Sequence, residues 1–380
     1  MAAGLDEQTD TQAATRALLQ TLRDPTAACL GGAGLSGAAW TALVATARSA
    51  HLLGTLAERL HEAGVAAPPA VARHLDGARR LAARQRLSVQ WEAHALQAAL
   101  GALGVPVVLL KGAAYVMSPL GLGAGRMFGD VDILVPRAAL GDVESALMLA
   151  GFVSAKSDDY DQRYYRQWMH EIPPMAHLHR GTVLDVHHTI LPLTSRHAPD
   201  PLAIVARATP LPELPALHVP AIEDLVIHSL VHLVHEGELA HGLRDLWDID
   251  AMVRAHGRVP GFWDRLTDHA GGNDLAGPVA FGLQLAQRVL ATPVPAPVQA
   301  ALAGRGGTGW AGKGLVRHYL RALAVGPEGG APGWRATWSR QRIYLRAHAL
   351  RMPPALLVRH LAVKAWRGVR AADTEPAAER

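Results

Sequence analysis

The sequence predicts an α+β fold in which a mixed β-sheet with flanking helices lies between N-terminal and C-terminal helical regions. Leu, Val and Ala recur at three- and four-residue spacing up to about residue 100 and again from residue 222, which is typical of amphipathic helices. Between these regions stand three short apolar runs, rich in β-branched residues, at 107–110, 131–135 and 182–190. Runs of this kind are typical of buried strands.

The elements follow one another with clear boundaries. Helical spacing over 50–63 and 70–100 ends at Gly104-Val105-Pro106, and the first strand follows. Gly112 ends that strand and a helix is expected over 113–117. A glycine-rich stretch at 121–125 leads to the second strand, which Pro136 closes, and a helix over 137–150 ends at Gly151. Residues 160–172, aromatic and charged, match neither pattern, whereas 222–235 and 243–255 are predicted helices.

Composition narrows the class of protein. The chain has 380 residues, 49% of them hydrophobic and 18% charged, which is typical of a globular protein and excludes a disordered one. The net charge of +4 suits a phosphate-bearing ligand without requiring nucleic acid. One cysteine excludes an intrachain disulfide. The acidic N-terminus is unlike a secretory signal, and the uncharged stretch 25–47 contains turn signals, so we expect a cytoplasmic protein without a transmembrane segment.

Two aspartates mark the start of the second strand. Asp130 and Asp132 are two residues apart and therefore point to the same face. A divalent cation would remove their mutual repulsion, since Mg²⁺ prefers oxygen ligands. Asp185 lies in the third strand, and if the strands are neighbours all three aspartates can share two metal ions about 3.5–4 Å apart. The alternatives are a solvated turn at Gly129 for the pair, and an ion pair with an arginine such as Arg180 for Asp185.

Basic and small residues stand where a phosphate would be bound. Gly112, at the expected junction of strand and helix, lets the backbone approach a phosphate, and the helix start offers free N–H groups. Lys111 and Arg126 would supply positive charge to phosphate oxygens. His187 shares the expected face of Asp185, where it would contact a phosphate, tune the carboxylate or remain exposed. The alternative for Lys111 is a surface lysine whose stem covers apolar residues.

In this order the motifs resemble a known family. Leu109-Leu110-Lys111-Gly112, then Arg126, Gly129-Asp130-Val131-Asp132 and Leu184-Asp185-Val186-His187 are similar to the bacterial family of uncharacterised nucleotidyltransferases, within the polymerase-β-like nucleotidyltransferase superfamily. The resemblance runs from about residue 50 to residue 266. It implies Mg²⁺ (or Mn²⁺), a nucleoside triphosphate as co-substrate, and transfer of a nucleotide to an unidentified acceptor. Lys111-Gly112-Ala113 departs from the Gly-Ser or Gly-Gly usual at the phosphate turn of the superfamily.

The resemblance assigns roles and boundaries. We expect catalytic and metal-binding roles for Asp130, Asp132 and Asp185, and nucleotide or phosphate binding by Lys111, Gly112, Arg126, Gly129 and His187. The expected regions are a helical region at 1–95, a nucleotidyltransferase domain at 96–205, a helical acceptor-binding region at 206–300 and a basic helical segment at 301–380. The acceptor stays open: a small molecule, a peptide, a protein or RNA.

Two further motifs are interpreted as structural. His228, His232 and His235 share one face of a predicted helix, but without a convincing Cys or Glu partner we expect them to pack or to line the acceptor pocket, not to bind zinc. Gly32-Ala33-Gly34-Leu35-Ser36-Gly37 has the spacing of a dinucleotide fingerprint, but no predicted strand precedes it, so we interpret it as coincidence.

The C-terminal segment raises a different class of function. Between Gly333 and Arg370 every charged residue is basic, and Trp and Tyr residues are interleaved. We favour a helical hairpin broken at Pro353-Pro354, with contact to an anionic surface as the alternative. Two other classes of function therefore stay open: a catalytically silent nucleotide-binding accessory protein, and a nucleic-acid-binding protein that uses this segment.

Overall fold

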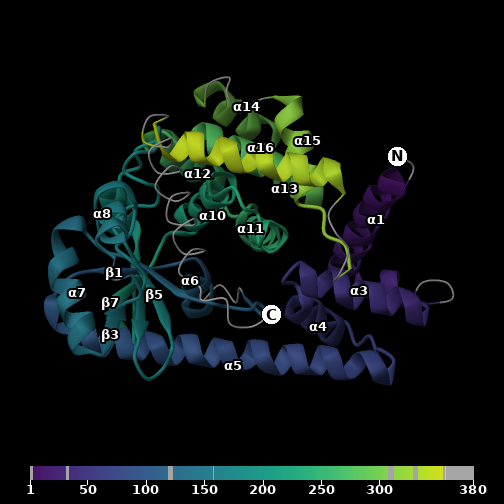
Figure 1. Ribbon diagram of the computed structural model, residues 1–380, viewed down its shortest axis with the longest axis horizontal. Coiled ribbons are helices and arrows are strands. Elements are labelled where there is room, and N and C mark those ends of the chain that lie inside the picture. Colours follow the sequence, from purple (N-terminus) through teal and green to yellow (C-terminus); the bar gives the residue numbers. More distant parts are fainter. Residues whose placement is uncertain are drawn as a thin grey trace, which may run out of the picture.

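A single mixed sheet forms the centre of the computed structural model, which describes residues 3–30, 34–118, 123–156, 158–306, 312–327, 333–353 and 356. The described strands form this sheet in the order β3-β4-β5-β2-β1-β7-β6. Helices precede, interrupt and follow the strands in the chain (Figure 1). The α+β fold predicted from the sequence is confirmed.

The three predicted strands are the neighbouring central strands of the sheet. They are β1 (Val107–Leu110), β2 (Val131–Leu134) and β5 (Val183–His187). β2 pairs antiparallel with β1 on one side and parallel with β5 on the other. The other strands were not predicted: β3 (Phe152–Ser154), β4 (Met175–His177), β6 (Thr209–Leu211) and β7 (Leu214–Val219).

The unpredicted strands are short or contain proline. β3, β4 and β6 have three residues each, too few to show alternation. Pro210 in β6 and Pro215 in β7 lower the strand signal, because proline cannot donate to the ladder. β7 nevertheless pairs with β1, so the sheet continues past residue 205 into the range where the sequence predicted a helical region.

Of the helices before β1, α5 contacts the sheet through β7. α5 passes under the sheet at one end and under α3 and α4 at the other (Figure 1). The chain leaves it through a 3₁₀ turn, Gly101–Leu103, and then Gly104 in a left-handed conformation with φ 65°. The helices before β1 are α1 (Ala3–Arg23), α2 (Pro25–Leu30), α3 (Gly37–Ser49), α4 (Leu53–Glu62) and α5 (Pro69–Leu100).

Short helices connect the strands. The predicted helix after β1 is α6, and the one predicted over 137–150 is a 3₁₀ turn, Arg137–Ala139, followed by α7. Residues 160–172, left without a prediction, contribute most of α8, which Asp158 caps by accepting bonds from two backbone amides. These helices are α6 (Lys111–Met117), α7 (Leu140–Leu149), α8 (Asp159–Trp168) and α9 (Pro201–Arg207).

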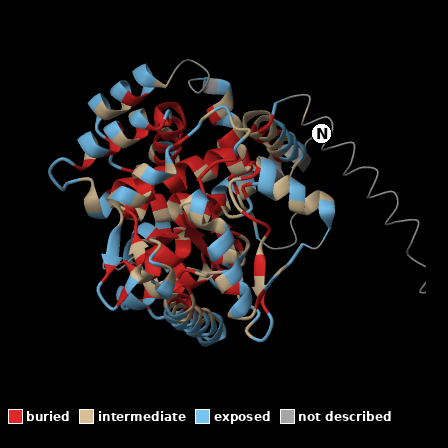
Figure 2. Ribbon diagram, turned by 90° about the vertical axis from the view of Figure 1, so that its left-hand side faces the viewer, coloured by how far each residue is buried: buried red, intermediate tan, exposed pale blue. Residues whose placement is uncertain are grey.

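The second helical region packs around α10. This helix is buried along almost its whole length and contacts α11, α12, α13 and α16, with α16 laid across it (Figure 1). Burial is continuous from the sheet into these helices, whose outer faces are exposed (Figure 2). The helices are α10 (Ile222–Glu236), α11 (Gly242–His256), α12 (Phe262–Gly272), α13 (Ala276–Leu290), α14 (Ala296–Arg305), α15 (Lys313–Ala322) and α16 (Trp334–Arg351).

The fold also bears on the predicted absence of a transmembrane segment and on the glycine motif at 32–37. In the described part of the chain no helix is long and apolar enough to cross a membrane. The motif at 32–37 follows α2, a helix, and its Ser36 hydroxyl caps α3 by accepting a bond from the Ala39 amide at 3.2 Å. Residues 31–33 lie outside the described residues, as do Pro354 and the basic segment beyond residue 356.

Candidate active site

The three predicted aspartates converge on one face of the central strands. Asp132 in β2 is the register partner of Asp185 in the parallel strand β5, and residues paired in this way project to the same side. Asp130, two residues before Asp132, belongs to the same face and is exposed, whereas Asp132 is buried. The neighbouring strands that the sequence argument required are therefore present.

Asp132 has two cationic or potentially cationic partners. The Lys111 ammonium donates to its Oδ1 at 2.9 Å, and His187 Nε2 lies 3.1 Å from the same oxygen. Burial alone would raise the pKa of Asp132, but the Lys111 charge and the His187 contact outweigh it and hold this pKa far below its usual range. The carboxylate is thus ionised, and Lys111 belongs to the cluster of acids and not to an isolated surface position.

Asp185 has an unsatisfied oxygen. Its Oδ1 is buried and has no hydrogen-bond partner among the described residues. Burial, followed by the charges of Glu171 and Asp132, raises the pKa of Asp185 to about 7. A buried oxygen without a donor is costly unless another group satisfies it. An all-oxygen set of Asp130, Asp132 and Asp185 fits Mg²⁺ or Mn²⁺, and the unpartnered oxygen is an atom that such an ion would satisfy.

Glu171 is a fourth acid at this site, and the sequence did not predict it. It lies between α8 and β4, forms an isolated bridge with His187 in β5, and places its Oε2 3.5 Å from His187 Nε2. Burial raises the pKa of Glu171. Ligand atoms of His170, Glu171 and His187 lie within 4.8 Å of one another, so they too are compatible with a metal ion. No motif marks Glu171, because its position depends on strand pairing.

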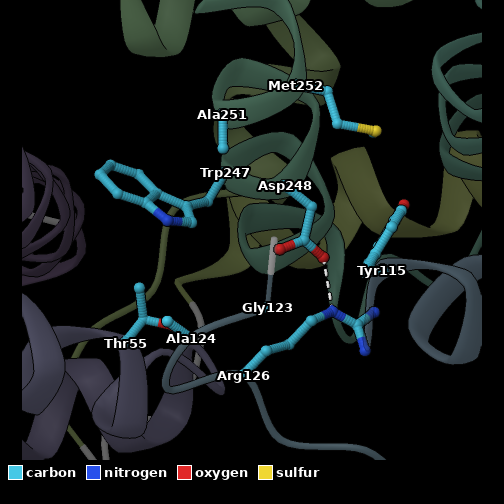
Figure 3. A pocket seen from close by; sticks show the side chains of 9 residues that line it. All are labelled: Thr55, Tyr115, Gly123, Ala124, Arg126, Trp247, Asp248, Ala251 and Met252. Atoms are coloured by element: carbon cyan, nitrogen blue, oxygen red, sulfur yellow. Dashed lines mark hydrogen bonds and ion pairs between the residues drawn. The ribbon is translucent and has the colours of Figure 1, made fainter. Parts of the chain in front are cut away.

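The ion-pair partner of Arg126 is Asp248 of α11. The Arg126 Nε donates to Asp248 Oδ2 at 2.7 Å, as Figure 3 shows. The guanidinium also lies over the rings of Tyr115 and Phe128. Both members of the pair are largely buried, with side-chain exposures of 9% and 13%. A cavity of about 40 Å³ adjoins the pair. The structure therefore places Arg126 in a contact between the loop before β2 and the second helical region.

Gly112 and Gly129 differ in their surroundings. A Cβ at Gly112 would come within 2.7 Å of Arg126 Nη1 and of the Phe128 ring, so the absence of a side chain is what lets these groups pack. Gly129 is exposed and, with Asp130, lines a hollow of about 150 Å³ beside α5. Neither glycine has a contact of its own with Asp132 or Asp185 within the described hydrogen bonds.

The ion pair proposed as the alternative for Asp185 does not form. Arg180 instead pairs with Glu92 of α5, with its Nη2 2.6 Å from Oε1. Glu92 also accepts a bond from the Thr182 hydroxyl at 3.0 Å. Arg180 therefore ties the start of β5 to α5, and Asp185 is left facing the other acids.

The chain belongs to a family of uncharacterised nucleotidyltransferases, whose model matches residues 36–291. The matched range contains the whole sheet and the helices from α3 to α13. Membership of this family agrees with the resemblance inferred from the motifs. It identifies the fold as an α+β nucleotidyltransferase fold with flanking helices, and by family the protein is a transferase. A comparison with curated proteins and another with solved structures found no match.

Proposed function

We propose that this protein transfers a nucleoside monophosphate from a nucleoside triphosphate to an acceptor and releases pyrophosphate, using divalent cations bound by Asp130, Asp132 and Asp185. The observation that carries the proposal is the pairing of Asp132 with Asp185 across parallel strands, together with the unpartnered Oδ1 of Asp185. Carboxylates grouped in this way would hold divalent cations that neutralise the charge of a bound triphosphate.

The reaction is an in-line displacement at the α-phosphorus. The acceptor oxygen forms a bond to that phosphorus, and the bond to the oxygen bridging towards the β-phosphorus breaks, so that pyrophosphate leaves with the electron pair. Bound divalent cations would supply charge neutralisation and polarisation of the attacking oxygen. Asp185, whose Oδ1 has no hydrogen-bond partner among the described residues, would accept the proton that the acceptor loses.

The phosphate-binding residues would act in different ways. Lys111, already within the acid cluster, would contact a phosphate oxygen, and His187 would hold Asp132 in position through its 3.1 Å contact. Gly112 and Gly129 would leave room for the triphosphate. Arg126 is paired with Asp248, so we propose that it holds the loop before β2 in place, an indirect role rather than a direct phosphate contact.

The helices after residue 220 would supply the acceptor pocket. His228 and His232 of α10 lie close enough to Lys111 for its charge to lower their pKa values, after the larger effect of burial. This face of α10 is therefore directed towards the carboxylate cluster. Neutral imidazoles at such a wall would give hydrogen-bonding groups for an acceptor without repelling metal ions.

The test is binding of the four nucleoside triphosphates, with and without Mg²⁺, to wild type and to the double variant Asp130→Ala/Asp132→Ala. Metal-dependent binding that is lost in the variant supports the site and identifies the donor. The matched control, Asp76→Ala/Asp264→Ala, replaces two exposed acids on helices α5 and α12 and should bind triphosphate as wild type does.

A second variant, which leaves the ion pair between Lys111 and Asp132 intact, excludes misfolding as the reason for lost binding. Asp185→Asn retains Asp132 and should lose the same metal-dependent binding while its circular dichroism spectrum is unchanged. Absence of triphosphate binding by folded wild type, at any Mg²⁺ concentration, would overturn the proposed function.

A further inference from the structure

A second group of potential metal ligands lies between α10 and α11. His232 and Glu236 are one turn apart on α10, with Nδ1 3.5 Å from Oε2, and Asp245 belongs to the first turn of α11. One ligand atom from each of the three lies within 4.8 Å of the others. These side chains come from two packed helices and are partly buried, with exposures of 30%, 28% and 14%.

The carboxylates of this group are only partly neutralised. Within the described residues, Glu236 has no ion pair with a lysine or arginine, and its Oε2 lies 3.5 Å from His232 Nδ1. Asp245 pairs with Arg244, but both guanidinium nitrogens contact the same oxygen, Oδ1, at 3.2 and 3.0 Å, which leaves Oδ2 available. Burial and the charge of Asp245 raise the pKa of Glu236, as expected for two acids that repel each other.

Imidazole nitrogens without partners stand beside the group. His228, only 4% exposed, lies one turn before His232 on α10, with ring centroids 6.3 Å apart, and its Nδ1 has no hydrogen-bond partner in the described structure. The same is true of Nδ1 of His241, whose carbonyl accepts the Asp245 amide at 2.9 Å. Buried nitrogens of this kind are normally satisfied by a donor, a water or a metal ion.

We propose that His232, Glu236 and Asp245 bind one divalent transition-metal ion, Zn²⁺ or Mn²⁺, at a site separate from Asp130, Asp132 and Asp185. A set of one nitrogen and two oxygens suits these ions better than Mg²⁺, which prefers oxygen alone.

The proposed site would join α10 to α11 across a strained connection. The chain between the helices contains Gly237 with φ 87° and Leu239 with φ 53°, and the second value is unfavourable for a side chain. α11 also carries Asp248, the partner of Arg126. An ion at this position would therefore hold the helix that positions the loop before β2.

The histidine motif of the sequence contributes one member of this site. His235, considered with His228 and His232, turns away: its Nδ1 lies 2.9 Å from the Val231 carbonyl, and its ring packs against His197. Glu236 and Asp245 supply the carboxylates that the sequence argument did not find, because one of them comes from the next helix.

The first experiment measures metal binding to the full chain, without nucleotide, by dialysis against Zn²⁺ and elemental analysis. The background is Asp130→Asn/Asp132→Asn/Asp185→Asn/Glu171→Gln, which removes the three aspartates and also Glu171 of the other candidate group, His170, Glu171 and His187. We expect about one equivalent of Zn²⁺, and a loss of affinity of more than about 100-fold on adding His232→Ala or Glu236→Gln. Glu238→Gln, at a neighbouring exposed acid, is the matched control and should bind normally.

A second measurement avoids that background. Co²⁺ added to Glu171→Gln, which lacks one member of the His170, Glu171 and His187 group, should give the absorption of a nitrogen-containing site, and adding His232→Ala should abolish it while circular dichroism stays unchanged. Zn²⁺ and Co²⁺ binding that is unaffected by His232→Ala and Glu236→Gln, or no Zn²⁺ binding by folded protein, would overturn the proposal. Neither result depends on triphosphate binding, so the two proposals fail separately.

Discussion

The Lys111 ammonium lies 2.9 Å from Asp132 Oδ1 at the point where β1 ends and α6 begins. The antiparallel register sets Leu110 opposite Asp132, so the next residue along the chain reaches the carboxylate. Lys111 adopts φ 42°, a left-handed conformation that costs on the order of 1–3 kcal/mol for a residue other than glycine. This strain at the junction places the charge of Lys111 within the acid cluster.

Replacing Lys111 with methionine should destabilise the protein and make its stability depend more on Mg²⁺. Asp132 is 3% exposed and would keep only His187 as a partner, whereas Lys111 is 23% exposed, so we expect a loss of about 2–3 kcal/mol in the free energy of unfolding. Urea unfolding at pH 7.5 measures it. Mg²⁺ should recover more stability in Lys111→Met than in wild type, because the cation replaces the missing charge.

Lys156→Met is the control for that prediction, since Lys156 is exposed. Its unfolding midpoint should match that of wild type. Equal stability of Lys111→Met and wild type, with equal responses to Mg²⁺, would show that the ion pair does not contribute.

Breaking the Arg126–Asp248 ion pair should reduce the stability of the protein more than most single substitutions do. Asp248→Asn leaves the buried Arg126 guanidinium, which lies over two aromatic rings, without its counter-charge. We expect the free energy of unfolding to decrease by about 3–5 kcal/mol. The double variant Arg126→Met/Asp248→Leu should be less unstable than Asp248→Asn, since it removes both charges. Denaturant unfolding of the three proteins gives the comparison.

The exposed pair of Arg305 and Asp268 provides the matched control. Their side chains are 52% and 73% exposed at a separation of 3.5 Å, so Asp268→Asn should change stability by less than about 0.5 kcal/mol. If Asp248→Asn and Asp268→Asn have the same small effect, the contact between this loop and α11 is not maintained by charge.

The contact between Gly54 and Gly125 joins the N-terminal helices to the loop before β2. A Cβ at Gly54 would lie 2.3 Å from the Gly125 carbonyl oxygen, and Gly125 itself has φ 72°. Gly54→Ala should therefore force the backbone to move and lower the free energy of unfolding by about 1–3 kcal/mol. It should also weaken triphosphate binding, because the displaced loop leads to Asp130.

Gly77 gives the opposite expectation. It lies within α5, and a Cβ there would meet nothing within 4 Å, so Gly77→Ala should stabilise the protein by about 0.5–1 kcal/mol. Thermal unfolding of both variants measures the contrast. A Gly54→Ala protein as stable as wild type, with unchanged triphosphate binding, would contradict the assigned role of this contact.

The sequence predicted the part of the site that depends on local geometry. Asp130 and Asp132 share a face because strand side chains alternate, and the apolar composition of 107–110, 131–135 and 182–190 correctly identified the three central strands. The sequence set one condition, that the strand of Asp185 lies next to that of Asp132, and the register of β2 and β5 meets it.

The remaining partners depend on contacts between distant segments, which no local pattern encodes. Arg126 meets Asp248 across 122 residues, and Arg180 meets Glu92 across 88. Glu171 reaches His187 through a single bridge, and Asp245 meets His232 only because α11 packs against α10. In the sequence, none of these charged residues can be told apart from the many others that have no such partner.

Acid should destabilise the protein partly through His188, which follows β5 directly. The side chain is 3% exposed, and burial, followed by the charge of Arg137, lowers the pKa of His188 to about 4 from an ordinary value of 6.5. Between these values the unfolded chain binds a proton that the folded protein does not. Stability is therefore unaffected by His188 above about pH 6.5 and falls as the pH decreases towards 4.

Replacing His188 with glutamine removes this one titration. The urea midpoint of His188→Gln should decrease less between pH 7.5 and pH 4.5 than that of wild type, although some decrease remains because burial also lowers the pKa values of His228 and His235 to about 3. The matched control is His94→Gln, at an exposed position of α5, which should keep the wild-type dependence on pH. An identical decrease in His188→Gln and wild type would mean that His188 takes up its proton without loss of folding free energy, and would require the loop after β5 to open at low pH.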